Sequence, residues 1–414
     1  MKPAIGIEVP VAALEFDLPR SKALTQGLGL LNKTTYDSEN SIASVGPGAR
    51  WLDVYRTLDE YNVGVLGGRI GTVGVGGLLL GGGCSLYLFR QGFATDNIAA
   101  FEVVLANSTV ITASARENRD LFTALKGGGN NFGIVTRFDL MAFPASPIWN
   151  GSTTHPEGDD PSAHVAALKR WIDNVETYQN SSAAVFWTYR PQLKETVIIK
   201  RLVDVGGRPS PPIFGEFLSI PGNTSGSSVV TNLSAIALGG QAAGYRNIWF
   251  SVTFKNDERV LTRAVELHHR LVEEMKADSS DGDFETQCFF QPLPSIIGKH
   301  GVDKGGNLLG IDRLKDNAVI LLGSLAVNDQ MQEAIGREKM MAWKRDLEDY
   351  SRSLDAQVEY YYMNYADGTQ DVLGSYGEER VQMALEVAAK YDPTGVFQKR
   401  VVEGFKLPNA ARQV

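Results

Sequence analysis

The chain has 414 residues, of which 43% are hydrophobic and 21% charged, and its net charge is -8. This is the composition of an ordinary globular protein, and the length favours two domains or one domain with a large insertion. Lysines and arginines are scattered instead of clustered, which argues against a nucleic acid or an anionic membrane as partner. No apolar run of about eighteen residues marks a membrane span.

The first stretch of the chain, MKPAIGIEVPVAALEFDLPRSK, lacks the features of a secretory signal, which taken literally predicts a cytoplasmic protein. Six Asn-x-Ser/Thr sequons point instead to an ancestor that passed through the secretory pathway. These sequons begin at Asn32, Asn107, Asn150, Asn180, Asn223 and Asn232. The localisation therefore stays open. Cys84 and Cys288 are too few for a disulfide framework and are expected to be free thiols.

The region from Ile42 to about Pro144 consists of short alternating apolar segments separated by turn signals. This pattern predicts strands at 41–48, 99–114 and 132–143, the second of them a hairpin that turns at 106–109. Apolar residues at helical spacing predict helices at 49–62 and 118–128. The block is therefore expected to be mixed α+β.

Glycine makes up ten of the twenty residues from Gly64 to Gly83. Each glycine in an ordered element costs about 0.5–1 kcal/mol relative to alanine, so the run implies unusual dihedrals or a ligand against the backbone. The sequence does not match a Walker phosphate-binding loop, because no Gly-Lys is followed by Ser or Thr. It does not match the dinucleotide-binding pattern GxGxxG either, because Leu79 stands where the last glycine belongs.

A second cluster, Gly127 to Gly129, lies in the stretch LKGGGNNFGIVTRF. Alone, this triplet would be interpreted as a helix end followed by a turn. Together with the first cluster it predicts two stretches of backbone that line one long groove, because glycine lets backbone N–H groups approach a phosphate closely.

From about Ser146 to Asp355 the predicted elements become longer. Helices are expected at 161–178 and 257–276, and strands at 183–190, 195–202, 247–255 and 318–327. They favour an antiparallel sheet with helices on one face. The Ser/Gly-rich stretch 225–244 is expected to be a mobile loop. A last part contains a predicted strand at 356–367 and a helix at 378–393. These changes of pattern divide the chain into 1–145, 146–355 and 356–414.

Several segments carry a family resemblance in the same order: GVGGLLLGGGCS, GFATDNIAAFEVVLA, NRDLFTALKGGGNNFGIVTRF, YYYMNYAD and YDPTGVFQ. From about Gly27 onward the chain resembles the FAD-linked oxidoreductases of the vanillyl-alcohol oxidase superfamily, in particular the fungal members of the berberine-bridge-enzyme-like group. The resemblance implies a PCMH-type FAD-binding domain, a middle sheet that covers the isoalloxazine ring, and a C-terminal segment that returns to the FAD-binding domain.

The resemblance also implies cofactor contacts, in which glycine stretches run along the extended FAD. The residues that it assigns to FAD are Gly71, Thr72, Gly74, Gly76, Gly77, Gly81, Gly82, Gly83, Ser85, Asp96, Asn97, Gly133, Ile134, Val135, Asn364 and Gln398. On this view, glycine occurs at these positions because the cofactor occupies the space that side chains would fill.

The beginning of the chain departs from the family pattern. Family members begin with a further βαβ unit whose Gly-Gly-His motif holds the pyrophosphate and often links the flavin covalently, whereas residues 27–48 here already match the segment after that motif. All five histidines lie beyond residue 150, and Arg69, Ile70 and Gly71 stand where a second linkage, to cysteine, would occur. We therefore expect an N-terminally shortened FAD-binding domain with noncovalent FAD.

The resemblance assigns catalysis to tyrosines of a Tyr-x-Asn-Tyr segment, which Tyr362 and Tyr365 match. A base there would take a proton while a hydride passes to flavin N5. If 356–367 is a strand, Tyr361 and Tyr365 share one face and Tyr362 points to the other. The alternative is that these tyrosines only fill a core. The adjacent His268 and His269 diverge on a helix, so no metal site is expected.

These inferences predict an FAD-dependent oxidoreductase that oxidises an alcohol, sugar or secondary metabolite and passes electrons to dioxygen. An alternative is a catalytically silent relative that binds no FAD and acts, if at all, as a binding protein. A third interpretation is a flavin pocket used for a nonredox cyclisation.

Overall fold

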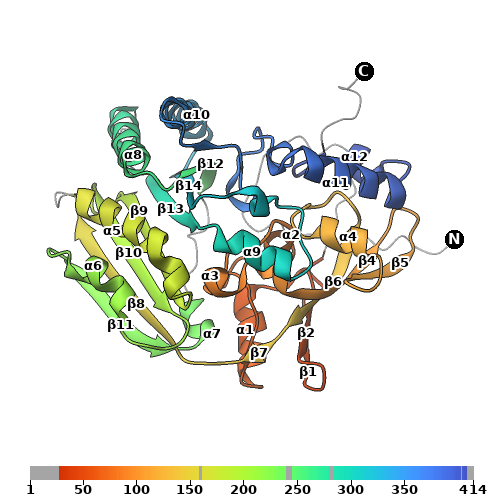
Figure 1. Cartoon of the computed structure of the whole chain (residues 1–414). Helices are drawn as coiled ribbons and strands as arrows, with labels where there is room; N and C mark the ends of the chain where they lie inside the picture. The colour runs from red at the N-terminus through yellow and green to blue at the C-terminus, as the bar shows by residue number, and fades with distance from the viewer. Residues whose placement is uncertain (1–27, 158–160, 239–244, 279–282, 402, 408–414) are drawn as a thin grey trace.

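The computed structural model describes residues 28–157, 161–238, 245–278, 283–401 and 403–407. Two large antiparallel sheets stand beside each other, each with its own helices (Figure 1). This mixed helix and sheet architecture confirms the predicted α+β class. No helix in these ranges is long and apolar enough to cross a membrane.

The first sheet has five strands in the order β1-β2-β6-β4-β5, all antiparallel. Its strands are β1 (Thr34–Asp37), β2 (Ile42–Val45), β4 (Ile98–Val104), β5 (Val110–Ser114) and β6 (Ile134–Met141). The helices nearest in sequence are α1 (Trp51–Asp59), α2 (Val75–Leu80), α3 (Leu88–Gln91) and α4 (Arg119–Leu125), and β3 (Val63–Gly64) pairs with β7 (Phe143–Pro144). The predicted hairpin is confirmed, because β4 pairs with β5 across the turn that contains Asn107.

The second sheet has eight strands in the order β11-β8-β10-β9-β13-β14-β12-β15. Its strands are β8 (Ile148–Pro156), β9 (Ser181–Arg190), β10 (Glu195–Asp204), β11 (Ser225–Thr231), β12 (Arg246–Lys255), β13 (Glu285–Leu293), β14 (Ala318–Val327) and β15 (Gln357–Val358). The helices α5 (Pro161–Asn174), α8 (Glu258–Asp278) and α10 (Gln330–Ser353) lie along one face of this sheet (Figure 1). The expected antiparallel sheet with helices on one face is confirmed.

Short helices connect these elements. They are α6 (Gly215–Ser219), α7 (Leu233–Ile236), α9 (Ile296–Asp303), α11 (Glu378–Tyr391) and α12 (Val396–Lys399), with 3-10 turns at Ala94–Asn97, Val175–Thr177, Pro212–Phe214, Ile311–Arg313, Met363–Tyr365 and Gly374–Tyr376. The stretch predicted as a mobile loop instead contains β11 and α7, because Ser225–Thr231 pairs with β8. Residues 239–244 of that stretch lie outside the described residues.

The two faces of the eight-stranded sheet differ in burial. Trp187 and Phe290 are buried on the face of α5, where His164 contacts the Trp187 ring. Phe186 and Phe289 alternate with them and are only part-buried. The register places Phe186 opposite Phe289, with ring centroids 5.9 Å apart. One face is therefore a core, and the other lines the space toward the first sheet.

The end of the chain returns to the five-stranded half. Tyr391 of α11 donates to Asp120 of α4 at 2.8 Å, and Gln398 of α12 donates to the Asn131 side chain at 3.0 Å. The predicted strand at 356–367 is wrong beyond its start, because only Gln357–Val358 pairs with β12 and Met363–Tyr365 forms a 3-10 turn. The alternation of faces expected for these tyrosines does not apply.

His268 provides a prediction about acid stability. Its ring is buried on α8, and its Nε2 lies 2.7 Å from Thr286 Oγ1. Burial, and secondarily the neighbouring His269, lowers the pKa of His268 to about 3. The unfolded chain binds a proton below about pH 6.5, whereas the folded chain does not until pH 3. The free energy of unfolding is therefore expected to fall as the pH decreases through this window, by up to about 1.4 kcal/mol per unit.

Urea unfolding at several pH values between 4 and 7 measures this slope. In His268→Gln the side chain no longer titrates, and the slope is expected to be smaller by that amount. An unchanged slope would show that His268 is not the group responsible.

Candidate functional site

The two glycine clusters meet in space. The Gly129 N–H donates to the Leu80 carbonyl at 3.1 Å, at the end of α2. The side chain of Leu309, in the segment after α9, lies beside both Gly82 and Gly127. The two stretches that the sequence analysis placed along one groove are therefore neighbours.

The space beside most of these glycines is filled by the protein, which corrects the explanation predicted for them. A side chain at Gly71 would overlap the Ala237 carbonyl, one at Gly81 would overlap the Asn364 amide, and one at Gly83 would overlap Leu78 and Ala94. At Gly77, by contrast, a Cβ atom would have no described atom within 4 Å other than those of its chain neighbours and of its own helix backbone. Close packing of chain segments, more than a ligand, accounts for the glycines at 71, 81 and 83.

Tyr362 is fixed by hydrogen bonds to the glycine run. Its hydroxyl oxygen accepts from the Gly83 N–H at 3.0 Å, the Cys84 N–H at 3.1 Å and the Asn364 side-chain amide at 3.1 Å. The positive φ angles of Gly82 and Gly83, 110° and 84°, favour glycine where these N–H groups converge. Burial raises the pKa of Tyr362 well above its ordinary value. Tyr362 therefore acts as a clamp between the C-terminal segment and the glycine run.

Tyr365 has a different environment. Its hydroxyl oxygen accepts from Arg69 Nη2 at 2.6 Å, and its ring stands edge-on to Tyr362 at 4.8 Å between centroids. Arg69 Nη1 donates to Gln291 Oε1 at 2.8 Å, and the guanidinium lies 5.6 Å from the centre of the Phe289 ring. Burial raises the pKa of Tyr365 to about 12, whereas the Arg69 charge opposes this shift. A phenol beside a cation can lose its proton more readily than the clamped Tyr362.

This arrangement joins residues from three parts of the chain. Arg69 belongs to the glycine run, Phe289 and Gln291 to β13, and Tyr365 to the C-terminal segment. The sequence analysis did not assign Arg69 a role in the site, although an arginine within a run of glycines and aliphatic residues is itself a signal. It missed Phe289 and Gln291 because it did not predict β13.

Asp96 and Asn97 are held by the protein. Asp96 Oδ1 accepts from Asn307 at 2.7 Å and its Oδ2 accepts from the Phe93 N–H at 2.9 Å. The Asn97 amide donates to the Phe93 carbonyl at 2.9 Å, and its oxygen accepts from Lys304. Both side chains are buried, and their hydrogen bonds stabilise the turn after Gly92.

Lys126 is the buried counter-charge of Asp96. Burial lowers the pKa of Lys126 to about 8, although Asp96 opposes that shift. Its ammonium group lies 4.0 Å from the centre of the Phe122 ring. Burial raises the pKa of Asp96, against the Asn307 hydrogen bond and the Lys126 charge. Lys126 lies at the end of α4, directly before the second glycine cluster.

The other residues assigned to FAD lie along the same region. Gly133 packs against Val103, while Ile134 and Val135 pair with β4. The Thr72 carbonyl accepts from Arg50, Gly74 caps the start of α2, the Gly76 N–H donates to the Pro47 carbonyl, and Ser85 Oγ accepts from the Tyr87 N–H. Gln398 reaches the second cluster through Asn131. Their role toward a cofactor stays a prediction.

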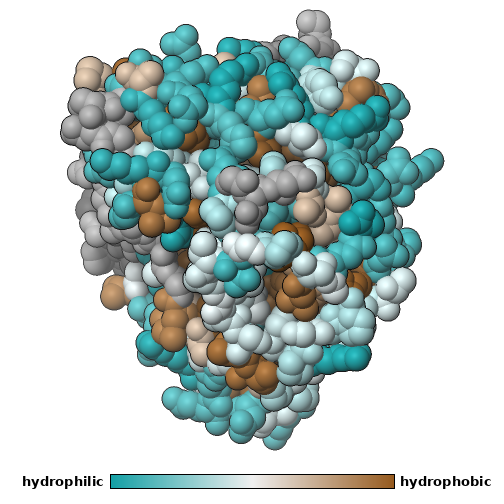
Figure 2. All heavy atoms as spheres, turned by 90° about the vertical axis from the view of Figure 1, so that its left-hand side faces the viewer, coloured by the Kyte–Doolittle hydropathy of each residue, from teal (hydrophilic) through white to brown (hydrophobic). Residues whose placement is uncertain are grey.

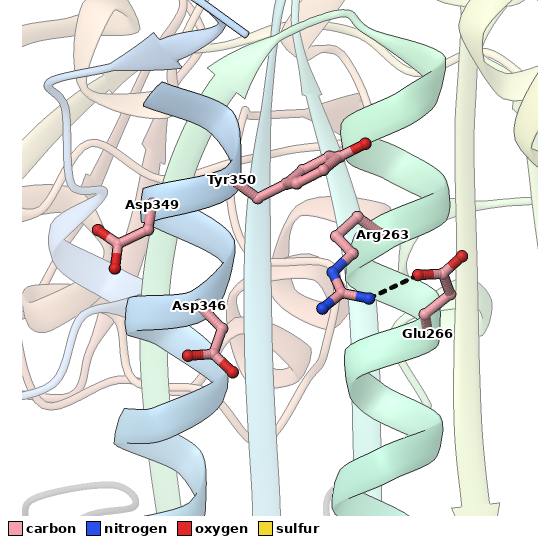
Figure 3. Close-up of a pocket in the computed structure, with 5 residues that line it drawn as sticks. All are labelled: Arg263, Glu266, Asp346, Asp349 and Tyr350. Carbon is pink, nitrogen blue, oxygen red and sulfur yellow. Dashed lines mark hydrogen bonds and ion pairs between the residues drawn. The ribbon is translucent and has the colours of Figure 1, made fainter. Parts of the chain in front are cut away.

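A hollow of about 510 Å³ lies elsewhere, between α8 and α10 (Figure 3). Arg263 donates to Glu266 there at 2.8 Å and lies 5.9 Å from the centre of the Tyr350 ring. The hollow is on the solvent side of the helices, because Ala264 and His268 face the core. It is a charged surface groove and does not touch the glycine clusters.

The face seen in Figure 2 carries hydrophobic residues in separate small groups among hydrophilic ones. Within the described ranges, no group of three or more His, Cys, Asp or Glu side chains is placed to bind a metal. Cys84 and Cys288 are both buried and free, which confirms the expected thiols.

Comparisons with known proteins identify the family. A profile for an FAD binding domain matches residues 24–114. The FAD-dependent monooxygenase drtC of Aspergillus calidoustus is 35% identical over 389 residues, which cover 93% of this chain and 73% of that protein. The FAD-dependent monooxygenase sdcF of Emericella nidulans is 34% identical, with 94% of this chain and 81% of that protein covered.

Solved structures share the fold. The 6-hydroxy-D-nicotine oxidase of Arthrobacter nicotinovorans matches with a TM-score of 0.72 at 19% identity, covering 93% of this chain and 83% of that one. The BBE-like 1 protein of Physcomitrella patens matches with a TM-score of 0.71 at 18% identity, covering 93% and 81%. Fold and sequence agree, and the chain belongs to the family of fungal FAD-dependent monooxygenases, which are FAD-linked oxidoreductases.

Proposed function

We propose that this oxidoreductase binds FAD noncovalently, oxidises a hydroxyl group of a small secondary metabolite, and uses dioxygen as the electron acceptor. The observation that carries the proposal is the Arg69–Tyr365 pair, which places a cation-supported phenol between the glycine run and the part-buried face of β13. The names of the relatives, FAD-dependent monooxygenases, support both the cofactor and the acceptor.

Two features of the glycine run and its neighbourhood fit a flavin. Gly77 leaves its side of α2 open, so that a flat ring can approach the backbone. The Thr95 hydroxyl is buried and has no hydrogen-bond partner among the described residues, while the Thr95 N–H donates to Gly82. Main chain at Gly77 and the Thr95 hydroxyl would hold the cofactor, which supplies, when bound, a two-electron acceptor whose electrons reduce dioxygen.

Noncovalent attachment is supported by the residues near the site. Arg69, Ile70 and Gly71 carry no thiol or imidazole. The Cys84 thiol is buried, and burial raises its pKa, so the reactive thiolate is disfavoured. The His300 ring nitrogen Nε2 lies 3.1 Å from the Phe89 carbonyl and is occupied there.

The proton of the substrate is handled by Tyr365. Oxidation of an alcohol to a carbonyl releases one hydride from carbon and one proton from oxygen, and the proton passes to the Tyr365 phenolate. Arg69 stabilises that phenolate through its hydrogen bond. Tyr362 takes no proton in this scheme, because its oxygen already accepts three N–H groups. The part-buried face with Phe289 covers the substrate and excludes water.

The proposal is tested with purified protein. After incubation with FAD and desalting, the protein is expected to be yellow with flavin absorption bands, and trichloroacetic acid is expected to release all the flavin into the supernatant. Anaerobic addition of a panel of aromatic and aliphatic alcohols is expected to bleach the flavin with at least one member. Readmission of air, with ¹⁸O₂ as label, distinguishes release of hydrogen peroxide from incorporation of oxygen into the product.

A colourless protein that takes up no FAD would contradict the proposal and favour a silent binding protein. Flavin that stays with the acid-precipitated protein would contradict the noncovalent part alone. The two results are separable, because colour and release are measured independently.

A further inference from the structure

A second arginine lies on the same face of the eight-stranded sheet as Phe289. Arg201 of β10 stands opposite Ala184 of β9 on one side and opposite Ser152 of β8 on the other. Directly opposite residues project to the same side of a sheet, so the Arg201 side chain is flanked by two small side chains. The space over Ala184 and Ser152 is therefore available to another group.

Neither Arg201 nor Arg69 is paired with a carboxylate among the described residues. Arg69 donates to the neutral Gln291 and Tyr365, and no described side chain forms an ion pair or a hydrogen bond with Arg201. Both are only part-exposed. Burial lowers the pKa of Arg201, and the charge of Arg69 lowers it further, so the two cations repel each other. Two partly desolvated cations that repel each other are unfavourable unless an anion compensates their charge.

The surface between the two arginines is aromatic. Phe186 lies opposite Phe289, and Phe186 is also opposite Ile199, two residues before Arg201. Arg201 is thus a diagonal neighbour of Phe186, at roughly 7–8 Å between backbones. Arg69 lies over the other end, on Phe289. This arrangement presents an apolar wall with a positive charge at each end.

We propose that Arg201, at the end of this surface opposite Arg69, binds an anionic group of the substrate, either a carboxylate or an ionised phenol or enol. The planar, conjugated part of that substrate lies on Phe186 and Phe289, and its hydroxyl group faces Tyr365. This inference rests on the proposed function and narrows its substrate to acidic aromatic or conjugated alcohols. Charge-assisted hydrogen bonds from guanidinium to an oxyanion supply the selectivity against neutral analogues.

Calorimetric titration of the purified protein, with FAD in excess, tests the site with 1-naphthoate and its neutral analogue 1-naphthamide as probes. The carboxylate is expected to bind at least about tenfold more tightly than the amide. Arg201→Gln is expected to weaken naphthoate about 10- to 100-fold and to leave naphthamide unchanged. Arg190→Gln, a matched loss of charge at the exposed end of the adjacent strand β9, is the control and should alter neither affinity.

Equal affinities of the two probes, the absence of binding up to their solubility limits, or full naphthoate affinity in Arg201→Gln would each overturn the inference. If Arg201→Gln loses affinity for FAD but not for naphthoate, Arg201 belongs to the cofactor site, and the inference is overturned as well. If the protein takes up FAD but only neutral alcohols bleach the flavin, this inference fails and the proposed function stands. If the protein takes up no FAD, the proposed function itself fails.

Discussion

Tyr365→Phe is expected to slow the anaerobic bleaching of the flavin by substrate about 10²- to 10⁴-fold, which is the usual contribution of a positioned general base. The variant keeps the ring that packs against Tyr362 and Phe289 and removes only the oxygen that Arg69 supports. Stopped-flow absorbance measures the rate, and flavin binding is expected to stay within a few-fold of the parent because no cofactor contact is assigned to this hydroxyl.

The pH dependence gives a second measurement of the same role. Because the pKa of Tyr365 is raised to about 12, only a small fraction is ionised near neutrality, and that fraction grows tenfold per pH unit. The rate is therefore expected to rise with pH between about 6 and 9, and Tyr365→Phe should lose this rise. Tyr361→Phe is the matched control, since the Tyr361 hydroxyl donates to Glu348 at 2.9 Å away from Arg69. An unchanged rate in Tyr365→Phe would remove Tyr365 from the chemistry.

Asp96→Ala is expected to lower the free energy of unfolding by about 1–3 kcal/mol, the usual cost of leaving buried hydrogen-bond donors without their acceptor. Lys126 would remain buried with no carboxylate, and the Asn307 amide and the Phe93 N–H would lose their acceptor. Urea unfolding at pH 7 measures the loss. At pH 9, above the pKa of about 8 of Lys126, the loss is expected to be smaller because neutral Lys126 needs no counter-charge.

Two further variants separate this effect from a general loss of contacts. Asp120→Ala removes an exposed carboxylate that pairs with Lys390, and about 1 kcal/mol or less is expected there. The double variant Asp96→Ala with Lys126→Met is expected to recover part of the stability. A loss in Asp96→Ala no larger than that in Asp120→Ala would show that the buried pair contributes little.

Local patterns predicted most of the fold because they are set by nearby residues. The β4–β5 hairpin and α8 follow from alternation and from helical spacing of apolar residues, and both are present. The prediction failed where tertiary contacts decide the local structure. Met363–Tyr365 forms a 3-10 turn that brings the rings of Tyr362 and Tyr365 edge to face at 4.8 Å, although the alternation favoured a strand.

The candidate site was predictable only in part. The Tyr-x-Asn-Tyr segment and the glycine run could be found in the sequence. The different roles of Tyr362 and Tyr365 could not, because they depend on which hydroxyl accepts from backbone N–H groups and which accepts from Arg69. The glycines at 71 and 81 looked like a surface for a ligand, whereas the Ala237 carbonyl and Asn364 occupy that space. Sequence spacing carries no information on partners so far apart along the chain.

The clamp at Tyr362 has a consequence for biosynthesis. Its oxygen meets the Gly83 N–H across 279 positions, and Tyr365 meets Arg69 across 296. At about 5–20 residues per second, the ribosome makes the glycine run roughly 15–60 s before the tyrosines that lock it. Nascent chains therefore lack both contacts until residue 365 has been made, and a product that stops short of residue 360 keeps nearly all of both sheets without these two tyrosines.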